Sequence, residues 1–467
     1  MRTSSITKSG LFLAFALMSM SLFAQQYGAI DYFRNYDKSG INVFETTKES
    51  AVPYDGFKLK ISGGFTTQFQ SLSHSNNADV VLKDNTLTST TGDSVDINAL
   101  YPLVGGFNLP TANLIISAQL ADGIYVNLEN YMSARHHNEF WVKGGYIQID
   151  KLPMFGNPQW FTDNFTVRIG QMENNYGDAH FYRTDNANGI LNPFVGENIM
   201  DAFATEMGGE FYYKPSNGII AMLGVSNGLL NSAMSEFIPV GDSVAVARKP
   251  SIYGKLGFDK QLTDDLRVRL TSSIYMNSGT SRNTLYGGDR AGSRYYWVGE
   301  GSYYLAPALT ATSFVNKAFS GRIDPGFSTN VQSIMINPFV KFMGLEVFAT
   351  YEMAKGSSSL TSTTDTVDRS FNQMAVSALY RFLKDEQAYV GVRYNTVKGQ
   401  LAGYTEADGD NGNITVNRLQ VAAGWFPTEN LLLKLEYVNQ DYLDFKTSDI
   451  RSDLNFNGVV VEACVGF

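Results

Sequence analysis

Ser226 and the four histidines are the residues whose types could carry catalysis or bind a metal. Ser226 lies in residues 224–228 (GVSNG), which match the G-x-S-x-G pattern that places a serine nucleophile on a tight strand-to-helix turn. No helical pattern follows it, and no histidine spacing indicates a catalytic pair. His136 and His137 are adjacent, so their side chains point apart on a strand, whereas metal-binding pairs are usually spaced i,i+2 or i,i+4. We therefore expect no catalytic residue, no bound metal and no cofactor.

Residues 406–413 (EADGDNGN) are acidic and rich in glycine, as calcium-binding loops are. However, glycine does not stand where a calcium loop turns, and no glutamate closes the stretch. We interpret it as a solvated hairpin loop, with calcium at the surface as the alternative.

A different chemistry, the electrostatic selection of solutes, is indicated by charged residues within alternating segments. In residues 266–276 the apolar side chains share one face, while Arg267 and Arg269 lie on the other. A charge on a lipid-facing wall costs roughly 2–4 kcal/mol near the bilayer midplane, so both arginines must face a polar lumen. The same alternation predicts that further charged side chains face the lumen. The bases are Lys58, Lys60, Arg168, Lys255, Arg381, Arg393, Arg418 and Lys434. The acids are Glu129, Glu206, Glu210, Asp259, Glu346, Glu352, Glu436 and Glu462.

These inward charges allow two interpretations. They could solvate the interior and pair with one another, or they could form an electrostatic filter that favours small anions. The bases slightly outnumber the acids on the predicted wall, although the whole chain has a net charge of -9. That overall charge argues against nucleic acid as a partner. We expect Arg168, Arg183, Arg267 and Arg269 to influence anion passage.

The elements that must position these charges are sixteen alternating segments. They cover 57–69, 113–119, 124–132, 140–150, 165–172, 203–213, 218–226, 251–260, 266–276, 331–341, 344–353, 371–382, 387–397, 414–426, 431–440 and 454–467. Short connections alternate with long polar ones, which predicts an all-β fold: a 16-stranded antiparallel transmembrane β-barrel with short periplasmic turns and long extracellular loops. The connection 151–164 is longer than expected for a periplasmic turn, so either this turn is elaborated or the strand register is wrong there. We assign residues 294–304 to a loop, because one more strand would break the even count.

The two ends of the chain indicate export to an outer membrane. Residues 1–24 read as a secretory signal peptide, with an apolar stretch over 11–23 and a small residue, Ala24, at the cut. We interpret 25–56 as a periplasmic N-terminal segment rather than a plug, and 57–467 as the barrel. The terminal alternating strand ends on Phe467, a signature that resembles the assembly signal of bacterial outer-membrane barrels. This strand should pair with the first and bring Glu462 near Lys58 or Lys60. We therefore predict the outer membrane of a Gram-negative bacterium.

One region carries a family resemblance. Residues 167–181 (VRIGQMENNYGDAHF), Arg183, residues 192–194 (NPF), Glu197 and residues 205–210 (TEMGGE) resemble a strand, the third extracellular loop and the next strand of the phosphate-selective porin O/P family, in a version found among Bacteroidetes-type chains. The resemblance implies a 16-stranded, trimeric porin whose third loop, here 173–202, folds into the lumen and narrows it. Phosphate specialists of that family line the pore with ladders of arginine and lysine. This loop has no such ladder, since Arg183 is its one arginine and it contains no lysine.

Together these observations predict a porin, a passive diffusion channel for small hydrophilic solutes with a preference for anions or phosphate. The alternatives are a barrel-rim hydrolase of the phospholipase or protease kind and a non-conducting outer-membrane scaffold or adhesin. Expected partners are outer-membrane lipid and lipopolysaccharide, small solutes or anions, the barrel-assembly machinery and two further copies in a homotrimer. The pore and constriction candidates are Arg168, His180, Arg183, Arg267, Arg269, Arg393, Arg418 and Lys434, and the lumen acids are Glu129, Glu206, Glu210, Glu346, Glu436 and Glu462.

Overall fold

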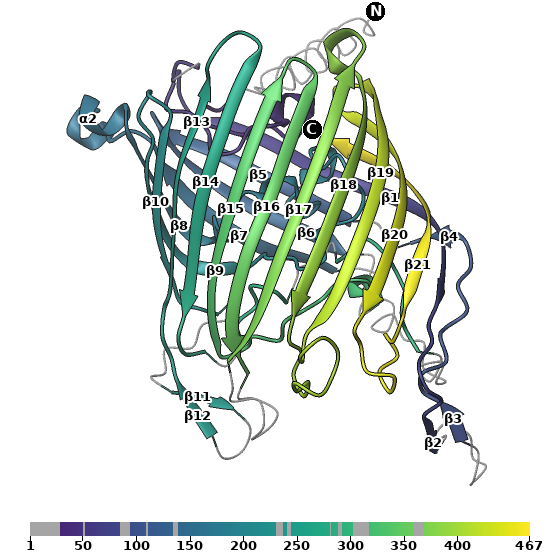
Figure 1. Ribbon diagram of the computed structural model, residues 1–467. Coiled ribbons are helices and arrows are strands. Elements are labelled where there is room, and N and C mark those ends of the chain that lie inside the picture. The colour runs from purple at the N-terminus through teal and green to yellow at the C-terminus, as the bar shows by residue number, and fades with distance from the viewer. Residues whose placement is uncertain are drawn as a thin grey trace, which may run out of the picture.

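The predicted alternating segments form one closed antiparallel sheet (Figure 1). In chain order its sixteen strands among the described residues are β1 (Lys58–Ser75), β5 (Thr111–Ala121), β6 (Ile124–Ser133), β7 (Glu139–Ile149), β8 (Phe165–Glu173), β9 (Thr205–Tyr213), β10 (Ile219–Ser226), β13 (Ser251–Gln261), β14 (Leu266–Asn277), β15 (Asn330–Phe342), β16 (Leu345–Ser357), β17 (Arg369–Phe382), β18 (Ala388–Gly399), β19 (Ile414–Thr428), β20 (Leu431–Leu443) and β21 (Asn455–Gly466). The prediction of a 16-stranded antiparallel barrel is confirmed.

The structure is a computed structural model that describes residues 29–49, 52–84, 94–108, 111–133, 139–229, 237–240, 244–280, 282–287, 292–301, 317–358 and 368–467. The predicted signal peptide (1–24), His136 and His137 lie outside the described residues. A short extra strand, β4 (Gly106–Phe107), pairs with β1. Small hairpins of β2 (Leu82–Asp84) with β3 (Ser94–Asp96) and of β11 (Phe237–Val240) with β12 (Val244–Ala247) lie at the long-loop end in Figure 1.

The last strand closes the barrel against the first, as predicted. β21 pairs with β1 from Gly64 opposite Gly466 to Ser75 opposite Asn455. Beyond the strand, the backbone of Phe467 exchanges hydrogen bonds of 2.9 and 3.0 Å with Gly63. Closure leaves the sheet without an open edge, which is the condition for a β-sheet to lie in hydrocarbon.

Side chains alternate between an apolar outer wall and a polar interior. On β14, Leu270 and Ile274 are exposed on the outside, whereas Arg269 and Tyr275 are buried inside. The other strands repeat this pattern, and their exposed leucines, valines and aromatic residues form an apolar outer surface. A closed barrel with an apolar outside and a charged inside is a transmembrane barrel. The protein therefore belongs in the outer membrane of a Gram-negative bacterium.

Short turns lie at one end of the barrel and long loops at the other. The C-terminus lies at the short-turn end (Figure 1). The long connection 151–164 is an elaborated turn, with the 3-10 helix η3 (Pro153–Phe155) and the short helix α2 (Gln159–Thr162). The flanking strands stay paired, with Ile149 opposite Val167, so the register is not wrong there. The described residues 294–301 contain no strand. Within the described part of the chain, no helix is long and apolar enough to cross a membrane.

The N-terminal segment differs from the sequence interpretation. Residues 29–48 lie against the inner wall, where Phe44 packs on Phe339 of β15 and Glu45 pairs with Lys255 of β13. The sequence pattern placed this segment in the periplasm outside the barrel. It has no alternating period, and only the folded lumen supplies the aromatic and cationic partners that draw it inside.

Candidate functional site in the barrel lumen

The third loop, defined here as residues 174–204, lies inside the barrel and binds its wall through backbone amides. The N–H of Asp178 donates to Asn337 at 2.8 Å, and that of Val195 donates to Glu436 at 2.8 Å. Farther along, the N–H of Ile199 donates to Asn395 at 2.7 Å. A buried loop must satisfy its backbone groups, and polar wall residues do so here. The inward-facing amides and carboxylates therefore hold the loop in place.

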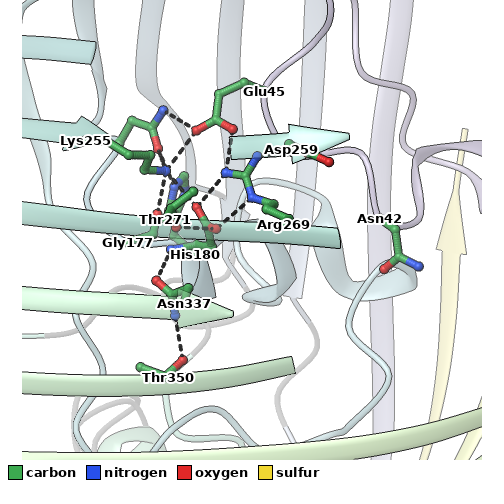
Figure 2. A network of polar contacts seen from close by, with 12 residues as sticks. Asn42, Glu45, Gly177, His180, Lys255, Asp259, Arg269, Thr271, Asn337 and Thr350 are labelled. Carbon is green, nitrogen blue, oxygen red and sulfur yellow. Dashed lines mark hydrogen bonds and ion pairs between the residues drawn. The ribbon is translucent and has the colours of Figure 1, made fainter. Parts of the chain in front are cut away.

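A central charge network joins the N-terminal segment, the third loop and the wall (Figure 2). Asp178 accepts from Lys255 and from Arg269, each at 2.8 Å. Glu45 lies on the other side of the same two cations, 2.8 Å from Lys255 and 2.6 Å from Arg269. The hydroxyl of Thr271 donates to Asp178 at 2.7 Å. Arg269 is therefore fully engaged by acids rather than open to a solute.

A second cluster holds the third loop against the terminal strand. Lys434 pairs with Glu462 at 2.7 Å, and Arg294 also pairs with Glu462. The Lys434 ammonium donates to three carbonyls of the third loop, those of Gly189, Asn192 and Phe194. All three charged side chains are fully buried.

The expected proximity of Glu462 to Lys58 or Lys60 is wrong. Glu462 does face the lumen, but Gln68 is the residue of β1 opposite it. Lys58 and Lys60 lie roughly 25–35 Å away along β1, at about 3.3 Å per residue. There Lys58 pairs with Asp55 at 2.9 Å, and Lys60 donates to Asn35 at 2.6 Å.

The remaining predicted cations also have partners. Arg183 pairs with Asp185 at 2.6 Å and with Asp201 at 2.9 Å, all within the third loop. His180 pairs with Glu173 at the end of β8. The others are held as follows: Arg168 donates to Gln148 at 2.7 Å, Arg267 pairs with Asp259 at 2.7 Å, and Arg393 and Arg418 donate to the carbonyls of Gly196 and Glu197.

The six predicted lumen acids all accept hydrogen bonds from neighbouring groups. The partners are Asn127 for Glu129, Ser226 and Tyr275 for Glu206, the N–H of Asn175 for Glu210, Arg381 for Glu346, Tyr295 for Glu436, and Lys434 with Arg294 for Glu462. The interior thus matches the pairing interpretation in its geometry. Sequence reasoning missed Asn42, Phe44, Glu45 and Arg294, which lie in non-alternating segments that offer no periodic signal.

The described part of the lumen contains a small and a large cavity. One of about 50 Å³ lies between the third loop and the wall of β15 to β18, lined by Arg183, Glu197 and Arg393. The other, of about 540 Å³, opens at the short-turn end and is called the vestibule here. Charged side chains of both signs line the vestibule: Lys38, Asp264, Asp265, Arg267, Lys341, Arg381 and Glu386.

Ser226 does not form a nucleophilic pair with a described histidine. Its hydroxyl donates to Glu206, and it ends β10, with no helix in the described residues 227–229 that follow. His74 contacts the carbonyl of Tyr101, and His180 contacts Glu173 and Asn175. Among the described residues, no group of three or more metal-ligating side chains is arranged to hold an ion.

Glu197 in the third loop is expected to make stability depend on pH. Burial raises its pKa to about 7, and Asp201 adds repulsion, while Arg183 opposes the shift. Its carboxyl is therefore protonated more readily in the folded barrel than in the unfolded chain, so its contribution to stability falls as pH rises from about 4.5 to about 7. The Glu197→Gln variant should be more stable than wild type at pH 8 by about 3 kcal/mol, and the difference should nearly vanish at about pH 4.5. Unfolding in detergent at several pH values measures this difference, and an advantage independent of pH would contradict the assignment.

No family model matches the chain, and no curated protein matches it. Solved structures resemble it at low identity. The outer-membrane channel DcaP of Acinetobacter baumannii has a TM-score of 0.49 at 11% identity, over 89% of this chain and 99% of that one. An anion-selective porin from Comamonas acidovorans has a TM-score of 0.48 at 12% identity, over 88% of this chain and 100% of that one. The Salmonella typhi OmpF complex with daunomycin has a TM-score of 0.45 at 13% identity, over 89% and 99%.

Proposed function

We propose that the protein is an outer-membrane porin, a passive channel for small hydrophilic solutes. The observation that carries this proposal is the contrast between the two faces of the barrel, an apolar outside and an interior lined by charged and amide side chains. Burying so many ionic groups would cost much free energy in a barrel whose interior had no function. A hydrated path for solutes, in contrast, needs charged and polar side chains along its wall. The vestibule of about 540 Å³ supplies the periplasmic mouth of that path.

The third loop serves as the constriction, and the vestibule selects solutes by charge. Of the two arginines on β14, only Arg267 lines the vestibule, with a quarter of its side chain exposed. Lys341 is exposed to a similar degree beside it. Cations that remain accessible to water attract anions, so we infer a preference for small anions, with Arg267 as the main contributor. Phosphate is one such anion. The third loop, however, contains no ladder of arginine and lysine side chains that would select phosphate over other anions.

The protein is further proposed to be a homotrimer embedded in outer-membrane lipid and lipopolysaccharide. The barrel-assembly machinery would recognise the terminal strand. Phe467 supports this part of the proposal, because its ring is half exposed at the end of β21.

Arg267 offers a direct test of selectivity. In planar bilayers with a salt gradient, Arg267→Ala should move the reversal potential toward the value of a non-selective pore, because the accessible positive charge is gone. Lys260→Ala is the matched control, since Lys260 is exposed on the neighbouring strand and is not among the residues that line the vestibule. Unchanged selectivity after Arg267→Ala together with Arg269→Ala would rule out the charge filter.

A non-conducting scaffold or adhesin is the second candidate function. The filled lumen favours it, since the N-terminal segment and the third loop both occupy the interior. Such a protein would insert into a bilayer and pass no current, so the same recordings separate it from a porin. A rim hydrolase would cleave phospholipid or peptide in detergent and lose that activity with Ser226→Ala.

A further inference from the structure

Residues 29–48, called the lumen segment here, occupy the periplasmic half of the interior without joining the sheet. They contain only a short 3-10 helix, η1 (Lys38–Gly40). Among the described residues, the backbone bond from the lumen segment to the barrel runs from the N–H of Lys38 to the carbonyl of Glu429, at 2.9 Å. Side chains make the other attachments. The segment can therefore withdraw without breaking a strand ladder of the barrel.

Several side chains attach the lumen segment to the interior, among them Arg34, which donates to the carbonyl of Phe181 at 3.0 Å, and Asn42, which donates to Glu346 at 2.5 Å. Phe44 is almost fully buried, and its ring lies 5.4 Å from that of Phe339 on the wall and 5.6 Å from that of Phe181 in the third loop. Lys48, closer to the barrel strand that follows, pairs with Asp150 at 3.2 Å. The segment is thus held at several points along its length, and Glu45 lies between Phe44 and Lys48.

Glu45 occupies a site that would suit a free carboxylate. One of its oxygens is 2.8 Å from Lys255 and 3.0 Å from the amide nitrogen of Asn175, and the other is 2.6 Å from Arg269. The donors therefore converge on both oxygens of the carboxylate, as they do in carboxylate-binding sites. Lys255 and Arg269 come from β13 and β14 (Figure 2), and Asn175 comes from the third loop, so none of the three donors belongs to the lumen segment.

The local charge balance indicates which anion would replace Glu45. Three cations, Lys255, Arg269 and Arg267, share three acids, Glu45, Asp178 and Asp259. Without Glu45 the cluster has one excess positive charge. A monovalent carboxylate restores neutrality, whereas a divalent phosphate would add one negative charge too many in a buried site, which is unfavourable.

We propose that Lys255, Arg269 and Asn175 form a binding subsite for a small monovalent carboxylate, and that Glu45 fills this subsite as a tethered stand-in until the lumen segment withdraws. This inference rests on the proposed channel, because a solute reaches the subsite only through the lumen. It adds the chemical class of a solute and makes the lumen segment its intramolecular competitor.

Acetate tests the subsite by rescue of a shortened side chain. Glu45→Ala leaves a space about the size of acetate with its cationic donors still present. In detergent at pH 7 and constant ionic strength, 100 mM acetate should raise the unfolding midpoint of Glu45→Ala by about 2 °C. Wild type should not respond, because Glu45 already fills the subsite. Glu45→Gln fills the space without charge and should not respond either.

Glu49→Ala is the matched control, because Glu49 is an exposed glutamate directly after the lumen segment. Heat-modifiable gel mobility confirms that each barrel is folded, and Glu45→Ser replaces the alanine variant if that variant does not fold. Equal responses of all variants to acetate, or a response of the shortened variant to inorganic phosphate but not to acetate, would overturn the proposal. Binding is measured in detergent and current in bilayers. If acetate stabilises Glu45→Ala but the protein passes no current, the porin function is wrong and the subsite stands. If the protein passes current but acetate does not stabilise Glu45→Ala, the subsite is wrong and the porin function stands.

Discussion

Glu462→Ala is expected to lower the free energy of unfolding by about 3–5 kcal/mol, the usual cost of removing one partner from a buried ion pair. Glu462 is the acid that both Lys434 and Arg294 contact, and all three side chains are fully buried. Its removal would leave two cations inside the barrel with one partner fewer. Lys434 also holds three carbonyls of the third loop, so the loss should loosen that loop as well.

Urea unfolding in detergent, followed by heat-modifiable gel mobility, would measure the effect of Glu462→Ala. Glu429→Ala is the matched control, since Glu429 is exposed in the turn between β19 and β20, and this variant should stay within about 0.5 kcal/mol of wild type. Adding Lys434→Met to Glu462→Ala should recover part of the loss, because an apolar side chain of similar length removes the unpaired charge. Strict additivity of the two substitutions would show that the pair is not coupled.

Phe44→Ala is expected to raise the ratio of open to closed channels by at least about 100-fold. Truncating a buried phenylalanine costs about 3–5 kcal/mol, and each 1.4 kcal/mol changes an equilibrium by about tenfold. Phe44 contacts the wall through Phe339 and the third loop through Phe181 and Tyr182, so that energy favours the inserted state of the lumen segment alone. The barrel strands should keep their pairing, because the segment contributes no strand to the sheet.

Single-channel recording in planar bilayers measures this change as the fraction of time spent open. Phe57→Ala serves as the control, because Phe57 precedes β1 with its ring largely exposed and contacts none of these partners. If Phe44→Ala and wild type spend the same fraction of time open, the lumen segment does not control the passage of ions through the barrel.

Much of the wall could be predicted from the sequence, because strand side chains repeat with a period of two. The apolar residues that alternate with Arg267 and Arg269 predict that both arginines face the barrel interior, and the structure places both there. The same period could not show that Arg269 is buried among Asp178 and Glu45 while Arg267 borders the vestibule. Those two acids lie in segments without a period, and their positions depend on where each loop folds back.

The sequence by itself determined the sixteen strands, their closure through β21 and the face on which each wall charge lies, because hydrophobic alternation is local and lipid penalises a misplaced charge. Only the tertiary structure decided which charges meet. Glu462 pairs with Lys434 and Arg294 rather than with Lys58 or Lys60, since strand register and loop insertion bring distant residues together. The position of the lumen segment is likewise tertiary, because Phe44 and Glu45 find their partners only in a closed barrel.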